Sequence, residues 1–260
     1  MKVVAEAADV LHRPRAGLVI LLYHRVGART SVSVDLPLDR FDDQMAALAA
    51  SGRVIALDDA VELLMGGHDV TDRVVVTFDD GTADFTEVVV PVISRHRVPV
   101  TLYVATDFVE RGRWFPDSGR PATWSGLAEA VATGLVTMGS HTHTHALLDR
   151  VDQSRVESEL DRSIELIEDR LGVPADHFAY PKALAPSVIA DTEVRKRFRS
   201  AALAGTRPNP AGTDIHLLAR SPLQVDDGRR WFERKVAGGM RLEDELRRLV
   251  DRRRHAGAAA

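Results

Sequence analysis

Short runs of aliphatic residues alternate with helical patterns along most of the chain. The runs are continuous rather than alternating, which is typical of strands that are buried on both faces. Repeated strand–helix alternation predicts parallel strands joined by right-handed crossovers. The runs expected to be strands cover residues 18–23, 74–78, 100–105, 135–139, 177–180 and 217–220.

The segments between these runs carry the apolar spacing of helices. In residues 152–171, apolar side chains recur at intervals of three and four, so one stripe faces a core. Roughly seven or eight strand–helix units fit a closed α/β barrel better than an open doubly wound sheet, which remains the alternative. No GxGxxG motif follows an early strand, so a Rossmann nucleotide site is not expected. The expected helices cover residues 38–51, 58–65, 82–96, 124–133, 152–171 and 186–199.

Composition excludes several classes of protein. The 260 residues are expected to form a single domain over 1–260, which is long enough to bury a core without disulfides. With 34 basic and 38 acidic residues the net charge is -4, which provides no basic field for nucleic acid, so no nucleic-acid partner is expected. The absence of cysteine excludes a disulfide scaffold, a thiolate zinc site and a cysteine nucleophile. The sequence carries no prediction of oligomeric state.

The two ends of the chain differ from the rest. The early apolar run 17–23 is far shorter than the ~20 residues that span a bilayer, so no transmembrane segment is expected. A signal peptide is the alternative, but no small-residue cleavage site follows the run, and a cytoplasmic location is favoured. Residues 241–260 are expected to form a basic terminal helix and a frayed tail. The alternative is a basic surface for an anionic partner or a membrane.

Two adjacent carboxylates follow the strand predicted over residues 74–78. Asp79 and Asp80 precede Gly81, and in a barrel the carboxyl ends of the strands form the active-site face. Adjacent carboxylates repel each other unless a cation or a shared proton relieves the repulsion. The alternative is an Asp-Gly turn in which Asp79 caps the next helix.

Three histidines follow the strand predicted over residues 135–139. If the stretch is extended, His141, His143 and His145 share one face, and if it turns into a helix, His141 and His145 do. Either arrangement suits a divalent metal of the zinc type, and the alternative is a solvent-exposed polar loop. One carboxylate and two imidazoles would leave an open coordination position, as in catalytic metal sites. The other carboxylate would then be placed to take a proton from water.

Several motifs in order resemble the polysaccharide deacetylase family, also called the NodB homology domain or carbohydrate esterase family 4. Residues 77–81 read TFDDG and residues 140–145 read SHTHTH, which are similar to the first two motifs of the family. The YHRV of residues 23–26 and the FAYP of residues 178–181 resemble one subgroup, as does the leader segment 37–57. The likeness extends from about residue 18 to about residue 240.

The resemblance implies a fold, a reaction and a ligand set. The fold is a distorted (β/α) barrel of about seven strands. The reaction is metal-dependent removal of acetyl groups, usually from N-acetylated sugars, with an acetylated sugar or polysaccharide as the substrate. Asp80, His141 and His145 are implied as metal ligands and Asp79 as the catalytic base, whereas His143 is not a ligand. The metal is expected to be zinc, with cobalt or nickel as alternatives.

The chain departs from the family pattern at two motifs. Lys182 and Ala183 stand where Tyr-Gly is usual, and the backbone N–H of Lys182 can still serve an oxyanion. Its side chain is expected to stabilise the same oxyanion or to contact an acidic glycan, and the alternative is a solvent-facing lysine. The last motif, at residues 217–222, lacks its usual histidine. His24 is the expected general acid, and His216 is the next candidate to test. The alternative for His24 is a core histidine whose ring is bonded to a backbone carbonyl. Arg220 is expected to orient Asp79, with a surface ion pair as the alternative.

The substrate contacts are predicted from the third motif and from the small number of tryptophans in the chain. Tyr180 and Pro181 of the third motif, and Trp114 in the loop 112–121, are expected to contact the sugar. For Trp114 the alternative is packing within its loop. Two other functions remain open on the same fold: a noncatalytic glycan-binding protein, and a metal-dependent amidase that acts on a non-glycan amide. The acetyl group removed can be an amide or an ester.

Overall fold

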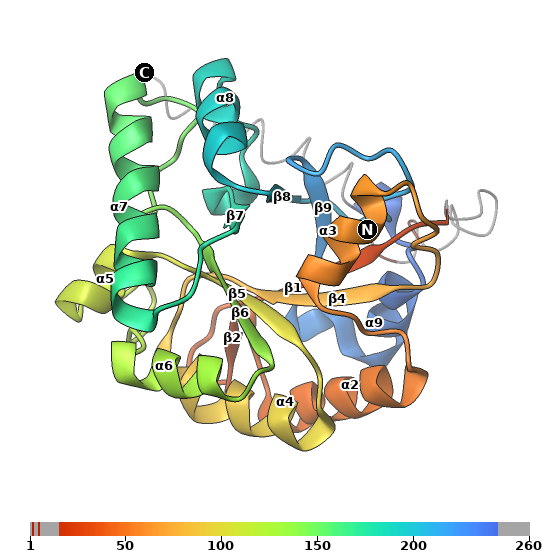
Figure 1. The fold of residues 1–260 in the computed structure, drawn as a ribbon. Coiled ribbons are helices and arrows are strands. Elements are labelled where there is room, and N and C mark those ends of the chain that lie inside the picture. Colours follow the sequence, from red (N-terminus) through yellow and green to blue (C-terminus); the bar gives the residue numbers. More distant parts are fainter. Residues whose placement is uncertain (1, 3–4, 6–15, 244–260) are drawn as a thin grey trace.

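The described part of the chain is a closed barrel. The computed structural model describes residues 2, 5 and 16–243. Among these residues, seven parallel strands form a closed ring in the order β1, β4, β5, β6, β7, β8 and β9 (Figure 1). Their bounds are β1 Val19–Tyr23, β4 Val74–Phe78, β5 Val100–Val104, β6 Val136–Ser140, β7 His177–Ala179, β8 Ser200–Ala204 and β9 Leu218–Pro222. The predicted barrel is confirmed, and the open sheet is excluded because β1 pairs with both β4 and β9.

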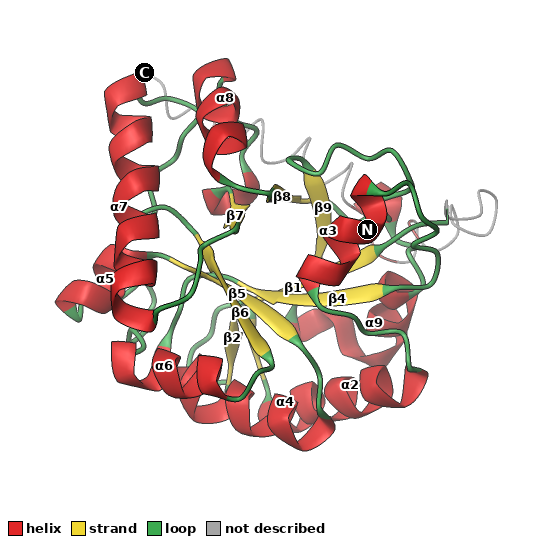
Figure 2. Cartoon of the chain, viewed as in Figure 1, coloured by secondary structure: helices red, strands yellow, loops and turns green. Residues whose placement is uncertain are grey.

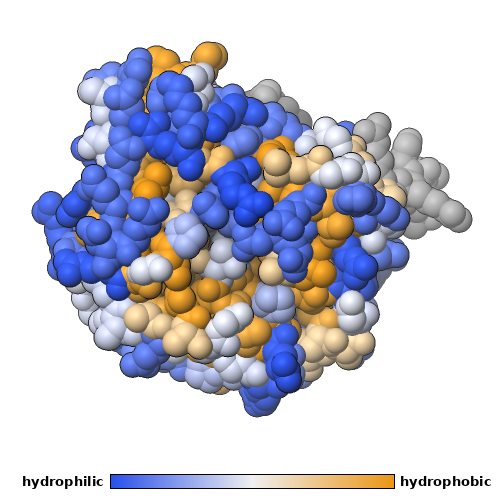
Figure 3. Space-filling model, in the orientation of Figure 1, coloured by the Kyte–Doolittle hydropathy of each residue, from blue (hydrophilic) through white to orange (hydrophobic). Residues whose placement is uncertain are grey.

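Helices surround the ring of strands (Figure 2). They are α2 Leu38–Ser51, α3 Leu57–Met65, α4 Val90–His96, α5 Thr106–Arg111, α6 Trp124–Ala132, α7 Gln153–Leu171, α8 Val188–Arg197 and α9 Gly228–Val236. Three short helical turns are η1 Phe85–Val89, η2 Pro181–Ala183 and η3 Val225–Asp227, and a separate two-stranded ribbon joins β2 Arg25–Val26 to β3 Asp35–Leu36. Hydrophilic residues dominate the surface over α7 and α8 (Figure 3). Within the described residues, no helix combines the length and apolar character that a bilayer crossing requires.

The longest predicted helix illustrates why the local sequence folds this way. Asp152 caps α7 by accepting a hydrogen bond from the backbone N–H of Arg155 at 2.9 Å. Gly172 ends the helix in the left-handed conformation, with φ 67. Val156 and Leu160 lie on the buried face, so the predicted apolar stripe packs against the barrel.

Two elements of the structure were not predicted, and one predicted helix is divided. Strand β8 was not predicted, because its sequence SAALA contains no β-branched or aromatic residue and it is formed by pairing with β7 and β9. Helix α5 was not predicted either. The single helix expected over 82–96 is divided into the π-helical turn η1 and α4, and Pro91, which lacks a backbone N–H donor, stands at the junction. Of the terminal segment 241–260, residues from 244 onward lie outside the described part.

Helix α3 closes the amino-terminal end of the barrel. Its apolar face packs on side chains from several strands inside the ring. At the same end, His177, the first residue of β7, contacts Asp58 at 3.0 Å through Nε2 and Ser200 at 2.8 Å through Nδ1. His177 and Ser200 have no exposed surface, so a substrate cannot reach this Asp–His–Ser group and its role is structural.

The register of the strands brings the predicted functional residues to the other end. Tyr23 lies opposite Phe78, so His24 and Asp79 follow their strands at the same level. Ser140, the last residue of β6, pairs with Val104 of β5, so His141 also leaves the barrel at this edge. The carboxyl ends of parallel strands therefore gather the two predicted motifs.

Candidate active site

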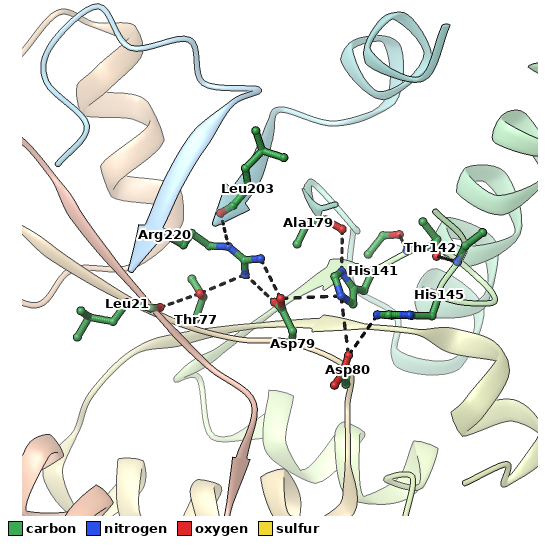
Figure 4. Close-up of polar contacts among 12 residues, drawn as sticks. Leu21, Thr77, Asp79, Asp80, His141, Thr142, His145, Ala179, Leu203 and Arg220 are labelled. Carbon is green, nitrogen blue, oxygen red and sulfur yellow. Dashed lines mark hydrogen bonds and ion pairs between the residues drawn. The ribbon is translucent and has the colours of Figure 1, made fainter. Parts of the chain in front are cut away.

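Three predicted metal ligands meet at the carboxyl end of the barrel (Figure 4). One donor atom from each of Asp80, His141 and His145 lies within 4.8 Å of the other two. The Nε2 atoms of His141 and His145 lie 3.8 and 3.6 Å from Oδ1 of Asp80. One carboxylate oxygen and two imidazole nitrogens form a donor set that suits zinc-type divalent ions. His143 is not part of this set, which agrees with the ligand set implied by the family resemblance.

The surroundings of the two histidines orient one ring and disfavour protonation of the other. The carbonyl oxygen of Ala179 lies 2.7 Å from Nδ1 of His141, and because a carbonyl only accepts, Nδ1 carries the proton. The Nε2 atom of His141 therefore faces the carboxylates of Asp79 and Asp80. Burial and the charge of His141 hold the pKa of His145 below its ordinary value, so that the His145 ring is neutral at neutral pH.

The second carboxylate of the pair is fixed by an arginine. Arg220 of β9 donates hydrogen bonds of 2.6 and 2.8 Å to the two oxygens of Asp79, and both residues are buried. Burial raises the pKa of Asp79, but the charges of Arg220 and His141 outweigh it and lower this pKa to about 2. Asp79 is therefore ionised at neutral pH, with Oδ2 3.8 Å from Nε2 of His141.

A buried glutamate of α7 fixes the loop between the two histidine ligands. Glu159, 1% exposed, accepts hydrogen bonds of 2.7 Å from both the backbone N–H and the hydroxyl of Thr144. Its backbone carbonyl accepts a third bond from the N–H of His143. Glu159 lies on the buried face of α7 beside Leu160, but the helical pattern of the sequence did not identify the loop as its partner.

Helix α5 holds the same loop from the other side. Nδ1 of His143 lies 2.9 Å from the hydroxyl of Thr106, and Nε2 lies 3.6 Å from a carboxylate oxygen of Asp107. The backbone carbonyl of His143 accepts a 2.8 Å bond from the N–H of Asp107. The middle histidine of the motif therefore anchors the loop, and sequence reasoning did not foresee Thr106 or Asp107.

A cavity of about 560 Å³ opens above the three ligands. The loop 112–121 forms one wall, and the guanidinium of Arg25 holds it by donating to the carbonyls of Pro116 at 2.7 Å and Asp117 at 2.8 Å. Gly119 leaves room for this guanidinium, because a Cβ there would lie 2.3 Å from Nη2 of Arg25. A volume of this size accommodates a sugar unit.

The comparisons with known proteins agree with this geometry. Residues 67–201, more than half of the chain, match a family model described as polysaccharide deacetylase. The chain belongs to the polysaccharide deacetylase family. The uncharacterized protein YlxY of Bacillus subtilis is a relative that is 23% identical over 114 residues. That match spans 44% of this chain and only 32% of YlxY.

Two solved structures show the same fold. A Streptococcus pyogenes deacetylase, PplD, solved in complex with acetate, superposes with a TM-score of 0.75 at 18% identity, covering 85% of this chain and 98% of that chain. IcaB from Ammonifex degensii superposes with a TM-score of 0.71 at 24% identity, over 85% and 98% of the two chains. At these identities the likeness concerns the fold.

The departures from the polysaccharide deacetylase pattern have visible consequences. Lys182 and Ala183 are both left-handed, with φ 53 and 54, and the second stands where the family pattern has glycine. Lys182 lines the cavity with an exposed side chain. His24, the predicted general acid, also lines it, and its buried Nδ1 has no hydrogen-bond partner in the described part of the chain.

Other predicted site residues lie away from the cavity. The ring of Tyr180 is buried under α7 and α8 against Phe178, 5.0 Å between ring centroids, and Pro181 is buried beside it. Trp114 belongs to the wall loop but is 59% exposed and does not line the cavity. Nε2 of His216 contacts the carbonyl of Phe198 at 2.9 Å, outside the cavity.

Proposed function

We propose that the protein is a metal-dependent hydrolase that removes acetyl groups from an N-acetylated sugar or polysaccharide. The observation that carries the proposal is the grouping of Asp80, His141 and His145 within 4.8 Å at the base of a cavity, with the ionised Asp79 beside them. Family membership supports the same reaction class. The same arrangement also suits an O-acetyl ester.

The donor set fits a divalent cation, most simply zinc, with cobalt and nickel as alternatives. Asp80, His141 and His145 would hold it, and three protein ligands are typical of catalytic rather than structural sites. A bound divalent cation supplies Lewis acidity to an acetyl carbonyl and to water. The carbonyl of Ala179 supports this role by fixing the ring orientation of His141.

The proposed roles of the remaining residues follow from their contacts. Asp79 removes the proton from the attacking water, because it is ionised and stands beside the ligands. Arg220 orients the Asp79 carboxylate through two hydrogen bonds. The backbone N–H of Lys182 is the proposed donor to the oxyanion. His24 provides a proton for the departing nitrogen, since it lines the same cavity from the end of β1.

The test is acetate release from N-acetylglucosamine oligomers by protein loaded with zinc, cobalt or nickel. Asp79→Asn should keep the bound metal and lose about 10²-fold or more in turnover, the scale of general-base catalysis. Asp72→Asn is the matched control, because the Asp72 carboxylate is 82% exposed and lies outside the cavity lining. Oligomer binding without acetate release under any metal would replace the proposal with a noncatalytic glycan-binding role. Faster release from small non-glycan amides would replace it with an amidase.

A further inference from the structure

Lys182 differs from the other cationic side chains that line the cavity. Arg220 is bonded to a carboxylate, Arg113 pairs with a carboxylate at 2.9 Å, and Arg25 donates to two loop carbonyls. In the part of the chain that the structure describes, the ammonium of Lys182 has neither a hydrogen bond nor an ion pair. This lysine is therefore the cation that remains available to a bound molecule.

The backbone fixes where this charge is presented. Lys182 and Ala183 both have positive φ, a conformation that costs an L-residue free energy and persists where the surroundings demand it. Pro181 precedes them, and the N–H of Ala183 donates a 3.0 Å hydrogen bond to the carbonyl of Tyr180. Lys182 lines the same cavity as Asp80, His141 and His145. The lysine charge is thus close to the metal ligands.

Two of the three carboxylates of the cavity lining already have a partner or a proposed role. Asp79 is bonded to Arg220, and Asp80 belongs to the group that would hold a divalent cation. Asp117 is the other carboxylate in the lining, and it belongs to the wall loop rather than to the turn that carries Lys182. With a divalent cation bound, the lining would carry an excess of positive charge, and among the described residues no carboxylate is bonded to Lys182.

We propose that Lys182 forms an anion subsite, and that the substrate is an acetylated glycan carrying a carboxylate or a phosphate near the acetylated sugar. The inference rests on the proposed deacetylase function and narrows its substrate class. An ammonium is a point charge with three donors, so it accepts either anion. A charge-assisted hydrogen bond in a partly enclosed cavity favours the anionic substrate by about tenfold.

Three substrate types of equal length test the proposal. One is a neutral N-acetylglucosamine oligomer, one alternates N-acetylglucosamine with a uronic acid, and one carries a phosphate monoester. The ratio of kcat/KM for an anionic substrate to that for the neutral one should be about ten in wild type at low salt and should fall as salt screens the charge. A preference for only one of the two anionic substrates identifies the group that is recognised.

The variants separate recognition from other roles of the lysine. Lys182→Gln keeps the backbone N–H and removes the charge, so the ratio should fall to about one, whereas Lys182→Arg should retain most of it. Lys196→Gln, on the exposed surface of α8, is the matched control and should leave the ratio unchanged. An equal loss on all three substrates would assign the charge to oxyanion stabilisation and overturn the proposal. An unchanged ratio in Lys182→Gln would overturn it as well.

A binding measurement keeps this inference separate from the proposed reaction. Titration of the same oligosaccharides into Asp79→Asn, with and without Lys182→Gln, needs no turnover. Tighter binding of the anionic glycan that is lost with Lys182 supports the subsite even if no acetate is released from any substrate. Acetate release with equal binding of neutral and anionic glycans leaves the proposed function standing and rejects the subsite. Circular dichroism and thermal melting verify that each variant is folded.

Discussion

Arg220 donates one hydrogen bond to each carboxylate oxygen of Asp79, at 2.6 and 2.8 Å, although the two residues are 141 positions apart. Both are almost completely buried, so each charge depends on the other. Breaking a buried pair by removing one partner leaves an uncompensated charge. The Arg220–Asp79 pair therefore orients the proposed base, and losing either partner should destabilise the fold.

The first prediction is a double-mutant cycle on this pair. Arg220→Gln alone should lower the free energy of unfolding by about 3–5 kcal/mol. Asp79→Asn together with Arg220→Gln should cost clearly less than the sum of the two single variants, because no unpaired charge remains. Urea denaturation of the metal-free proteins measures these values. Additive costs would show that the two charges do not depend on each other.

The same pair predicts a pH dependence. The pKa of Asp79 is about 2 in the folded protein against an ordinary 3.8, so its contribution to stability is present above 3.8 and is lost as pH falls toward 2. Without Arg220, burial raises the pKa of Asp79, and the carboxyl is protonated in mild acid. The stability deficit of metal-free Arg220→Gln should therefore be smaller at about pH 3 than at about pH 7. A constant deficit would contradict this assignment.

The second prediction concerns the metal ligands. Asp80→Ala, His141→Ala and His145→Ala should each weaken zinc binding by more than about 100-fold, because each removes one of three donors. His143→Ala should still bind one zinc, weakened about tenfold, since His143 anchors the loop without belonging to the ligand set. Equilibrium dialysis with metal analysis measures the affinities. If His143→Ala lost zinc as completely as His141→Ala, His143 would have to be counted as a ligand.

The third prediction concerns the glutamate of α7. Glu159→Gln replaces one of two acceptor oxygens with an amide that faces the donors of Thr144. The loop between the histidines should loosen, and zinc affinity should fall by about 10–100-fold. Glu168→Gln, on the exposed face of the same helix, should leave the zinc affinity unchanged. A lower melting temperature with unchanged zinc affinity would limit Glu159 to a structural role.

The fourth prediction separates proton donation from other roles of His24. His24→Ala should lose about 10²-fold or more in rate on an N-acetyl amide, whose leaving nitrogen needs a proton. An acetyl ester with a good leaving group should be affected far less. His216→Ala is the matched control, because its ring is bound to a carbonyl outside the cavity. Equal losses on amide and ester would move the general acid to another residue.

Several parts of the fold and the site could be predicted from the sequence. The strand before Asp79 was predicted correctly because VVVTF is β-branched and continuous, whereas β8 contains only Ser, Ala and Leu and takes its conformation from its neighbours. The grouping of Asp80 with two of the three histidines followed from the motifs. The support from Glu159 depends on how α7 packs against the loop, which local sequence does not specify.

The position of Tyr180 shows a limit of motif-based prediction. The motif suggested a contact with the sugar, but side chains alternate along an extended segment. Ala179 faces the barrel interior, so Phe178 and Tyr180 both point toward the helices. Period-two alternation, applied to residues 177–180, would have placed the Tyr180 ring in the core.

The order of the strands in the chain determines when, during synthesis, the proposed active site can be complete. The proposed base comes from β4, but the arginine that orients it comes from β9, which completes the ring between β8 and β1. A chain emerging from the ribosome presents all three ligand residues long before residue 220 exists. In such a chain Asp79 still lacks its counter-charge, because Arg220 has not been added. The proposed hydrolysis therefore requires β9, so that acetate release, if the proposal holds, would report that the whole ring has assembled.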